Sequence, residues 1–210
     1  MHFDEIKLKT AELEPLKHFY KDTLELPVVE DKDGLFSVRI GQTRLTFEQA
    51  MQGQPFYHYA FNIPENQFKE AKVWLLDKVE LNREDGEDEA DFESWNAHAV
   101  YFEDPAGNIV ELIARHNLDN ASEEPFTSES LLCVSEIGIV RDEVSLFVEE
   151  MQSEGFPKWR EGSDSFVPVG DEHGLFIIVK KDRRWYFAEK DSEIFPVTVN
   201  VSGYGTVDFN

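Results

Sequence analysis

Apolar and polar residues alternate in short stretches along the chain, and such alternation is typical of strands with one buried face. Between these stretches apolar residues recur three and four positions apart, which predicts amphipathic helices over residues 13–24, 68–79 and 144–151. The expected strands are residues 3–9, 35–40, 43–47, 57–63, 97–102, 109–114, 132–140, 166–169, 175–180 and 196–201.

The order of these elements repeats three times as a strand, a helix and two or three further strands. This repetition predicts an α+β fold of βαβββ units that form open, cleft-containing mixed sheets with the helices outside. Residues 196–201 begin a fourth unit that does not continue, and we expect this strand to pair within the C-terminal half.

A polar stretch without periodicity, residues 117–128, separates the second unit from the third and is predicted to be a linker. Residues 1–116 are then one domain of two units. Residues 129–210 hold a degenerate third unit and the partial fourth.

Composition limits the classes of partner. With 43 acidic and 20 basic residues, the net charge of −23 argues against nucleic acid. It favours either a surface charged for solubility or a cationic ligand. No apolar run approaches the ~20 residues of a membrane span. The N-terminus lacks a signal-peptide pattern, and the single cysteine, Cys133, suits a reducing compartment. We therefore expect a cytoplasmic protein without a membrane partner.

One carboxylate stands among apolar neighbours in YFEDPAGNIVELIAR, residues 101–115. Asp104-Pro105 and Gly107-Asn108 predict a hairpin turn before the last strand. Because alternate residues of a strand face opposite sides, Glu111 does not share the face of its apolar neighbours. Glu111 therefore points either at solvent or into a cavity.

The unit order and the turn DPAGNIVELI resemble those of the vicinal oxygen chelate superfamily. This group includes glyoxalase I, extradiol ring-cleaving dioxygenases, and fosfomycin- and bleomycin-resistance proteins. The resemblance covers residues 3–115 and is fainter in VSEIGIVRDEVSLFVEEM.

The resemblance implies that Glu111 is a metal ligand in a cleft and that His58, in YHYAFNI, is a second. Alternation agrees, because it separates His58 from the apolar face of Tyr59 and Phe61. An imidazole with a carboxylate suits divalent Fe, Mn, Zn or Ni.

Two positions depart from the family pattern. Glu5 stands where many members carry a histidine, and Arg44 occupies the fourth ligand position. Glu5 is then either a third ligand or a general base. Alternatively, Glu5, Lys7, Arg44 and Glu111 form a salt-bridge network without metal.

Other polar residues are candidates for substrate contacts. Lys7, Arg44 and Arg115 could pair with a substrate anion, and His98 is either a substrate contact, a third ligand or a strand-end residue. In the third unit Glu136 falls where Glu5 falls, but no acid corresponds to Glu111. We interpret this unit as a degenerate pairing unit.

Two functions remain open. The first is a metal-dependent lyase, isomerase or dioxygenase that chelates neighbouring oxygens of a small molecule, with Glu5 and Glu111 in catalytic roles. The second is a metal-free protein that sequesters a small ligand, as bleomycin-resistance proteins do. A second copy of the chain is a further candidate partner.

Overall fold

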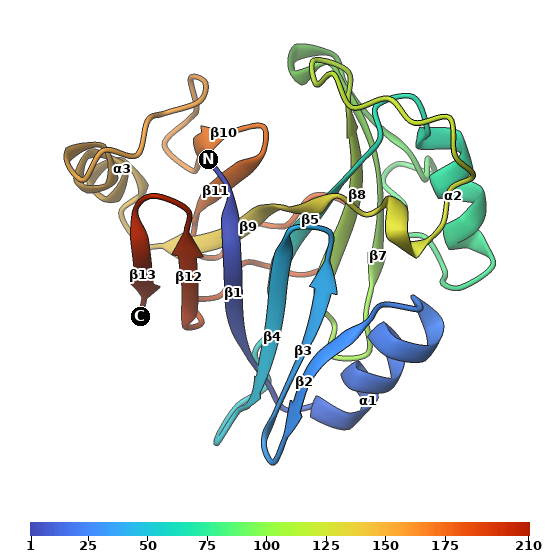
Figure 1. Ribbon diagram of the computed structural model, residues 1–210. Coiled ribbons are helices and arrows are strands. Elements are labelled where there is room, and N and C mark those ends of the chain that lie inside the picture. The colour runs from blue at the N-terminus through green and yellow to red at the C-terminus, as the bar shows by residue number, and fades with distance from the viewer.

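The computed structural model describes residues 1–210 and contains two open mixed sheets and three α-helices (Figure 1). Sheet A has the order β13-β12-β1-β4-β3-β2. Its strands are β1 (Phe3–Thr10), β2 (Val28–Lys32), β3 (Leu35–Ile40), β4 (Thr43–Gln49), β12 (Val197–Val201) and β13 (Gly205–Phe209). The expected α+β fold of open mixed sheets is confirmed.

Sheet B has the order β10-β11-β9-β5-β8-β7-β6. Its strands are β5 (His58–Ile63), β6 (Ala90–Phe92), β7 (Ala97–Glu103), β8 (Ile109–Arg115), β9 (Cys133–Arg141), β10 (Phe166–Asp171) and β11 (Gly174–Lys180). The helices are α1 (Leu13–His18), which continues as a π-helical turn (Phe19–Thr23), α2 (Phe68–Leu76) and α3 (Val144–Ser153). No helix is long and apolar enough to cross a membrane.

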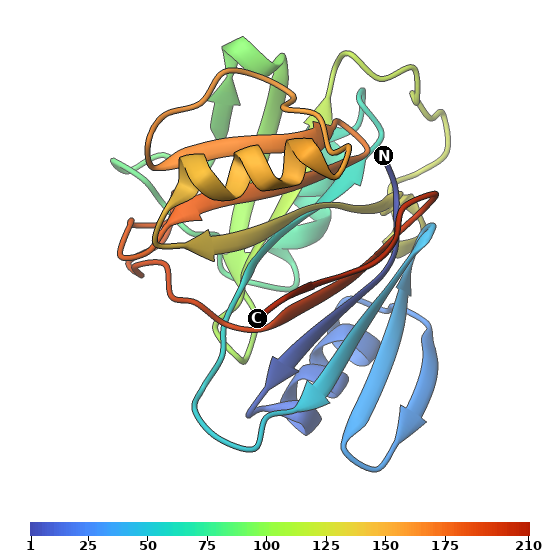
Figure 2. The ribbon, with the colours of Figure 1, turned by 90° about the vertical axis from the view of Figure 1, so that its left-hand side faces the viewer.

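The units pair differently from the arrangement expected from their order. In sheet A, β12 runs antiparallel to β1, so the first unit pairs with the C-terminal hairpin. In sheet B, β9 runs antiparallel to β5, so the second unit pairs with the third. The strand β12 pairs with β13, within the C-terminal half, but also with β1. Figure 2 shows this C-terminal hairpin beside β1. The expected pairing of β12 was therefore incomplete.

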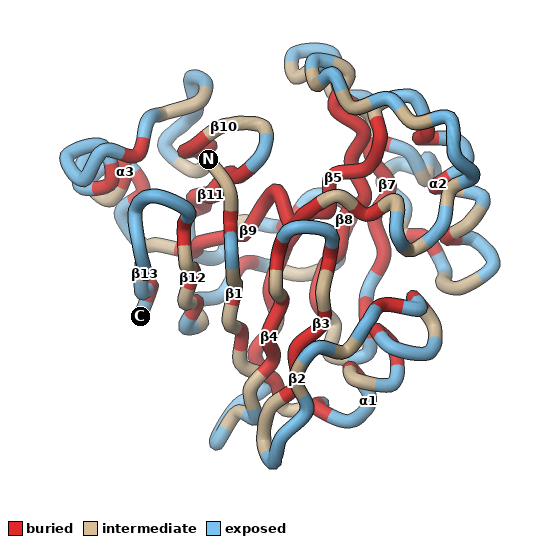
Figure 3. The backbone as a smooth tube through the Cα atoms, viewed as in Figure 1, coloured by how far each residue is buried: buried red, intermediate tan, exposed pale blue.

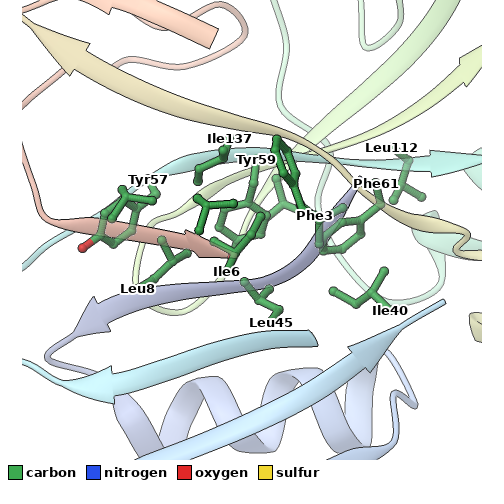
Figure 4. Close-up of a cluster of buried hydrophobic side chains, with 14 of the residues drawn as sticks. Phe3, Ile6, Leu8, Ile40, Leu45, Tyr57, Tyr59, Phe61, Leu112 and Ile137 are labelled. Atoms are coloured by element: carbon green, nitrogen blue, oxygen red, sulfur yellow. The ribbon is translucent and has the colours of Figure 1, made fainter. Parts of the chain in front are cut away.

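The main hydrophobic core lies between the two sheets and contains 43 buried residues. Figure 4 shows Ile6 and Leu45 of sheet A opposite Tyr59 and Phe61 of sheet B. Burying such an aliphatic or aromatic side chain contributes about 1.5–3 kcal/mol. The helices add their buried sides to this core, and exposed residues concentrate on their outer sides and on the loops (Figure 3). The opposite face of each sheet therefore lies outside this core.

The turn DPAGN connects β7 to β8 through a buried carboxylate, Asp104. The backbone N–H groups of Ala106 and Asn108 each donate to Asp104 Oδ1 at 3.0 Å. The hydroxyl groups of Tyr20 and Tyr59 donate to Oδ2 at 2.8 and 2.9 Å. Burial raises the pKa of Asp104, although these hydrogen bonds oppose the rise. The turn therefore ties the β7–β8 hairpin to β5 and to the π-helical turn that follows α1.

Three strands were not expected from the sequence. β2 is rich in charged residues, β6 has only three residues, and β13 follows a glycine-rich turn. The alternation in these segments is too short or too polar to distinguish a strand from a loop. In particular, β13 continues the fourth unit, which was expected to end at residue 201.

Candidate functional site

The strands β8 and β9 flank β5, and these three strands together bring three polar side chains to one face of sheet B. Ala60 of β5 pairs with Glu111 of the parallel strand β8 on one side. On the other side Ala60 pairs with Glu136 of the antiparallel strand β9. Since His58 lies two residues before Ala60, it shares the same face. All three side chains therefore point away from the core that contains Tyr59 and Phe61.

The three side chains converge. His58 Nε2 lies 3.6 Å from Glu111 Oε2 and 3.7 Å from Glu136 Oε2. One ligand atom from each residue lies within 4.8 Å of the others. The side chains of Glu111 and Glu136 are 2 % and 4 % exposed. Metal–ligand bonds of about 2 Å would fit such a cluster after small adjustments.

The orientation of the His58 ring leaves a lone pair for the cluster. His58 Nδ1 lies 3.2 Å from the carbonyl oxygen of Ile109. A carbonyl can only accept, so Nδ1 carries the proton and donates. In the neutral imidazole Nε2 is then unprotonated and faces the two carboxylates. Three electron-rich atoms thus meet at one point, which favours a cation between them.

A buried guanidinium compensates one of the two carboxylates. Arg115, which is fully buried, donates from Nη2 to Glu136 Oε1 and from Nε to Asn62 Oδ1 at 3.1 Å. Burial opposes ionisation of Glu136, but the charge of Arg115 holds its pKa below the usual value. Burial and the charge of Glu136 raise the pKa of Glu111 well above its usual value. Glu111 is therefore the carboxylate that lacks a counter-charge.

The donor set fits a divalent metal ion. Glu111 Oε1 and Arg115 Nη1 are buried and have no hydrogen-bond partner. Such unpaired polar atoms are costly unless a ligand satisfies them. One imidazole and two carboxylates suit Fe, Mn, Zn or Ni. On β11, Leu175 pairs with Glu136 and Ile177 pairs with Gly138, so this strand offers no fourth protein ligand and coordination positions would stay open.

The cluster forms the base of a cavity of about 250 Å³. Aromatic side chains make most of its wall: Phe92, Trp95, Tyr101, Phe166, Trp185 and Tyr186. The ring centroid of Trp185 lies 5.1 Å from that of His58. Gly138 of β9 makes room for this ring, since a Cβ there would lie 2.6 Å from Trp185 Cη2.

The segment between β11 and β12, residues 181–196, covers this face of sheet B. Ion pairs anchor it, from Arg184 to Glu84 at 3.0 Å and from Lys190 to Glu103 at 2.7 Å. Phe187 adopts a left-handed backbone conformation with φ of 53°. Its ring stacks on Tyr101 at 4.9 Å, and this packing holds a conformation that aromatic residues rarely adopt.

Three of the site residues expected from sequence lie elsewhere. Glu5, Lys7 and Arg44 share the polar face of sheet A, with Lys7 Nζ 3.5 Å and Arg44 Nη1 3.9 Å from Glu5 carboxylate oxygens. The network expected between them exists, but without Glu111. The expected closeness of Glu5 to His58 and Glu111 is wrong. The cause is the pairing of the first unit with the C-terminal hairpin.

The roles expected for two other residues also need correction. His98 faces α2, where its ring lies 5.5 Å from Phe68, whereas Tyr101 on the same strand faces the cavity. A substrate contact from His98 in this cavity is therefore excluded by strand alternation. Arg115 does lie at the cluster, but it is buried against Glu136 and is not open to a substrate anion.

Sequence reasoning missed the contribution of the third unit. Glu136 was recognised as equivalent to Glu5, and its alternation with Ile137 and Ile139 would place it on the face opposite to these two apolar residues. The signal was present, but which unit pairs with which could not be seen. The covering segment with Trp185 has no periodicity and gave no signal.

No protein-family model matches the chain, and no curated protein matches it. Solved structures do. A candidate dioxygenase from Bacillus subtilis subsp. subtilis str. 168 has a TM-score of 0.61 and 16% sequence identity, over 85% of this chain and 63% of that one. A variant of glyoxalase I from Zea mays has a TM-score of 0.55 and 13% identity, over 85% of this chain and 66% of that one.

These similarities concern the fold. The chain matches less than two thirds of the length of each of these two proteins. At this level of identity they show that the chain has the fold of glyoxalase I and of the candidate dioxygenase. The fold implied by the resemblance to the vicinal oxygen chelate superfamily is thereby confirmed.

Proposed function

We propose that this protein is a divalent-metal-dependent enzyme acting on a small molecule with two neighbouring oxygen atoms. The observation that carries the proposal is the convergence of His58, Glu111 and Glu136 in the lining of one cavity. Perturbed carboxylates in a largely apolar cavity are typical of functional sites. The fold shared with glyoxalase I is a supporting analogy.

The chain's own residues prepare such a site. His58 offers Nε2 because Ile109 holds the proton on Nδ1. Arg115 fixes one oxygen of Glu136 and leaves the other toward His58. A bound metal ion would act as a Lewis acid that polarises the substrate oxygens. Trp185 and Tyr101 exclude water from the surrounding wall.

The charges of the site favour an electron-rich substrate. With both glutamates ionised and Arg115 protonated, the cluster carries one net negative charge. A divalent cation would change this to one net positive charge. A substrate that develops negative charge on its oxygens would then be stabilised in a site of low dielectric constant.

Metal binding is the direct test. Chelator-treated protein is dialysed against Mn(II), Fe(II), Zn(II) or Ni(II), and bound metal is measured by mass spectrometry. We expect one ion per chain, and a loss of affinity of about a hundredfold or more when Glu111→Gln or Glu136→Gln removes a charged ligand. Glu5→Gln is the matched control, since it changes the same residue type in sheet A. Equal affinity in all three variants, or no bound metal, contradicts the proposal.

The class of reaction follows from the metal that supports turnover. Oxygen consumption with Fe(II) or Mn(II) and a diol-containing substrate would assign a dioxygenase. Conversion without oxygen, supported by Zn(II) or Ni(II), would assign a lyase or isomerase. His58→Gln should abolish either activity because it removes the only nitrogen ligand of the cluster.

A metal-free binding protein is the second candidate, and one observation favours it. Arg115 neutralises Glu136, and the raised pKa of Glu111 favours its protonated form. The cluster is then electrically compensated without any metal. A protein that binds a small ligand tightly, holds no metal and turns nothing over would be of this second kind.

A further inference from the structure

A guanidinium without an acidic partner forms part of the cavity wall. Arg183, at the start of the covering segment, lines the cavity. Its Nη1 donates to the carbonyl oxygen of Arg184 at 3.3 Å, and its guanidinium lies 5.3 Å from the ring centroid of Phe166. It makes no ion pair, although the chain has 43 acidic residues against 20 basic ones. Most of its five N–H donors are therefore available to a ligand.

The shape and lining of the cavity restrict what that ligand is. A cavity of 150 Å³ is large enough to bind benzene, and this one measures about 250 Å³. Its volume therefore accommodates one substituted aromatic ring. Trp95, Tyr101 and Trp185 present flat faces and edges, and aromatic groups pack well against such surfaces.

We propose that the cavity selects a single-ring aromatic anion. Arg183 pairs with its carboxylate or a similar group, and the ring packs among Trp95, Tyr101 and Trp185. The opposite end of the ligand then faces the cluster of His58, Glu111 and Glu136. This inference rests on the proposed function only in taking this cavity as the substrate site.

The overall charge of −23 does not oppose an anionic ligand here. Surface carboxylates act across water, and their field is screened beyond about 8 Å at physiological ionic strength. Inside the cavity, a contact to Arg183 is a charge-assisted hydrogen bond in a partly dry environment, which is much stronger at short range. The local cation therefore decides the selectivity.

Benzoate and benzamide test the selection in metal-free protein, because they differ in charge and hardly in shape. Binding is followed through the emission of the cavity tryptophans Trp95 and Trp185. We expect benzoate to bind about tenfold more tightly than benzamide. Arg183→Gln should remove this preference, chiefly by weakening the binding of benzoate. Arg160→Gln, which alters an exposed arginine outside the cavity, should keep the preference.

Arg183→Lys is the control for a folding defect. Because it keeps the positive charge, we expect it to keep most of the preference for benzoate. Equal affinities of the wild-type protein for the two probes, or an unchanged preference in Arg183→Gln, would overturn the inference. The outcome is separate from the proposed metal chemistry. Benzoate selection without any metal binding would remove the enzyme proposal and leave this one standing.

Discussion

The two sheets have the same arrangement of strands around their central pair, but different side chains occupy the corresponding positions. Strand register aligns Glu5, Thr46 and Thr198 of sheet A with His58, Glu111 and Glu136 of sheet B. In sheet A, Thr46 donates a hydrogen bond to Glu5 at 2.9 Å, and no three-residue ligand cluster forms. In sheet B, the corresponding positions hold one imidazole and two carboxylates, which converge.

The polar faces of the two sheets also differ in how far they are buried. The acidic residue of sheet A, Glu5, has a side chain that is 21 % exposed, with the 42 %-exposed Lys7 beside it. The carboxylates of sheet B lie beneath residues 181–196, and the one buried guanidinium, that of Arg115, pairs with Glu136 alone. Exposed ion pairs contribute little free energy, whereas buried charges must be matched closely. The comparison teaches that register places polar groups at corresponding positions in both sheets, and that burial and charge imbalance distinguish the cluster of sheet B from the polar face of sheet A.

The largest effect is expected from removing the buried cation. In metal-free protein, Arg115→Met leaves Glu136 without its partner, and we expect unfolding free energy to fall by about 3–5 kcal/mol. Arg44→Met, whose 35 %-exposed side chain pairs with Glu30 at 3.2 Å, should cost less than about 1 kcal/mol. Urea denaturation measures both. Similar costs would mean that the two faces do not differ in charge burial.

The second effect concerns pH. The folded-state pKa of Glu111 is raised, so the folded protein binds this proton more tightly than the unfolded chain does. Stability from this group is complete below the usual glutamate pKa and is lost as pH rises toward the folded-state value. We expect Glu111→Gln to flatten this loss in urea denaturation curves measured without metal.

The matched variant Glu5→Gln is expected to keep the wild-type slope, because its carboxylate lies on the partly exposed face of sheet A. A flattened slope in this variant, or an unchanged slope in Glu111→Gln, would show that the buried cluster does not control the pH response.

A smaller effect is expected where the cover meets the strand. Gly138→Ala pushes against the ring of Trp185, and overpacking of this kind costs about 1–3 kcal/mol. Tryptophan emission should shift as the ring moves. Asn200→Ala, on the uncovered face of sheet A, should change stability by less than about 0.5 kcal/mol. An unshifted emission spectrum in Gly138→Ala would mean that the cover is loosely seated.

The smallest effect is expected when a carboxylate is added to sheet A at the position that corresponds to Glu136 of sheet B. Thr198→Glu adds a carboxylate to sheet A at the level that Glu136 has in sheet B. We expect no measurable Mn(II) binding at that face, because water competes for an uncovered pair of carboxylates. The assay uses Glu111→Gln as background, so that the cluster of sheet B does not mask the result. Clear binding would show that position alone suffices.

The alternation of apolar and polar residues predicted which strand face carries His58 and Glu111. It could not predict which distant strands pair with each other. His58 and Glu111 could be assigned to a polar strand face because their own neighbours are apolar. Glu136 obeyed the same rule, yet its meeting with them depends on β9 pairing with β5. Arg115 was seen as a cation, but its burial depends on distant residues, namely Glu136 and the rings of Trp95 and Trp159.

The pairing of β1 with β12 has a consequence for the order of folding during synthesis. Ile6 is made 193 residues before its partner Val199. Ribosomes add about 5–20 residues per second, so one edge of β1 waits on the order of ten seconds for β12.

During that interval the second and third units can complete sheet B, whereas sheet A keeps an open edge along β1. Open edges pair readily with other chains. Lys7 and Lys9, which alternate along β1, are charged side chains of the kind that discourages such pairing. The first unit therefore keeps an edge open to other chains until the C-terminal hairpin is made, and these two lysines make that edge less prone to pairing.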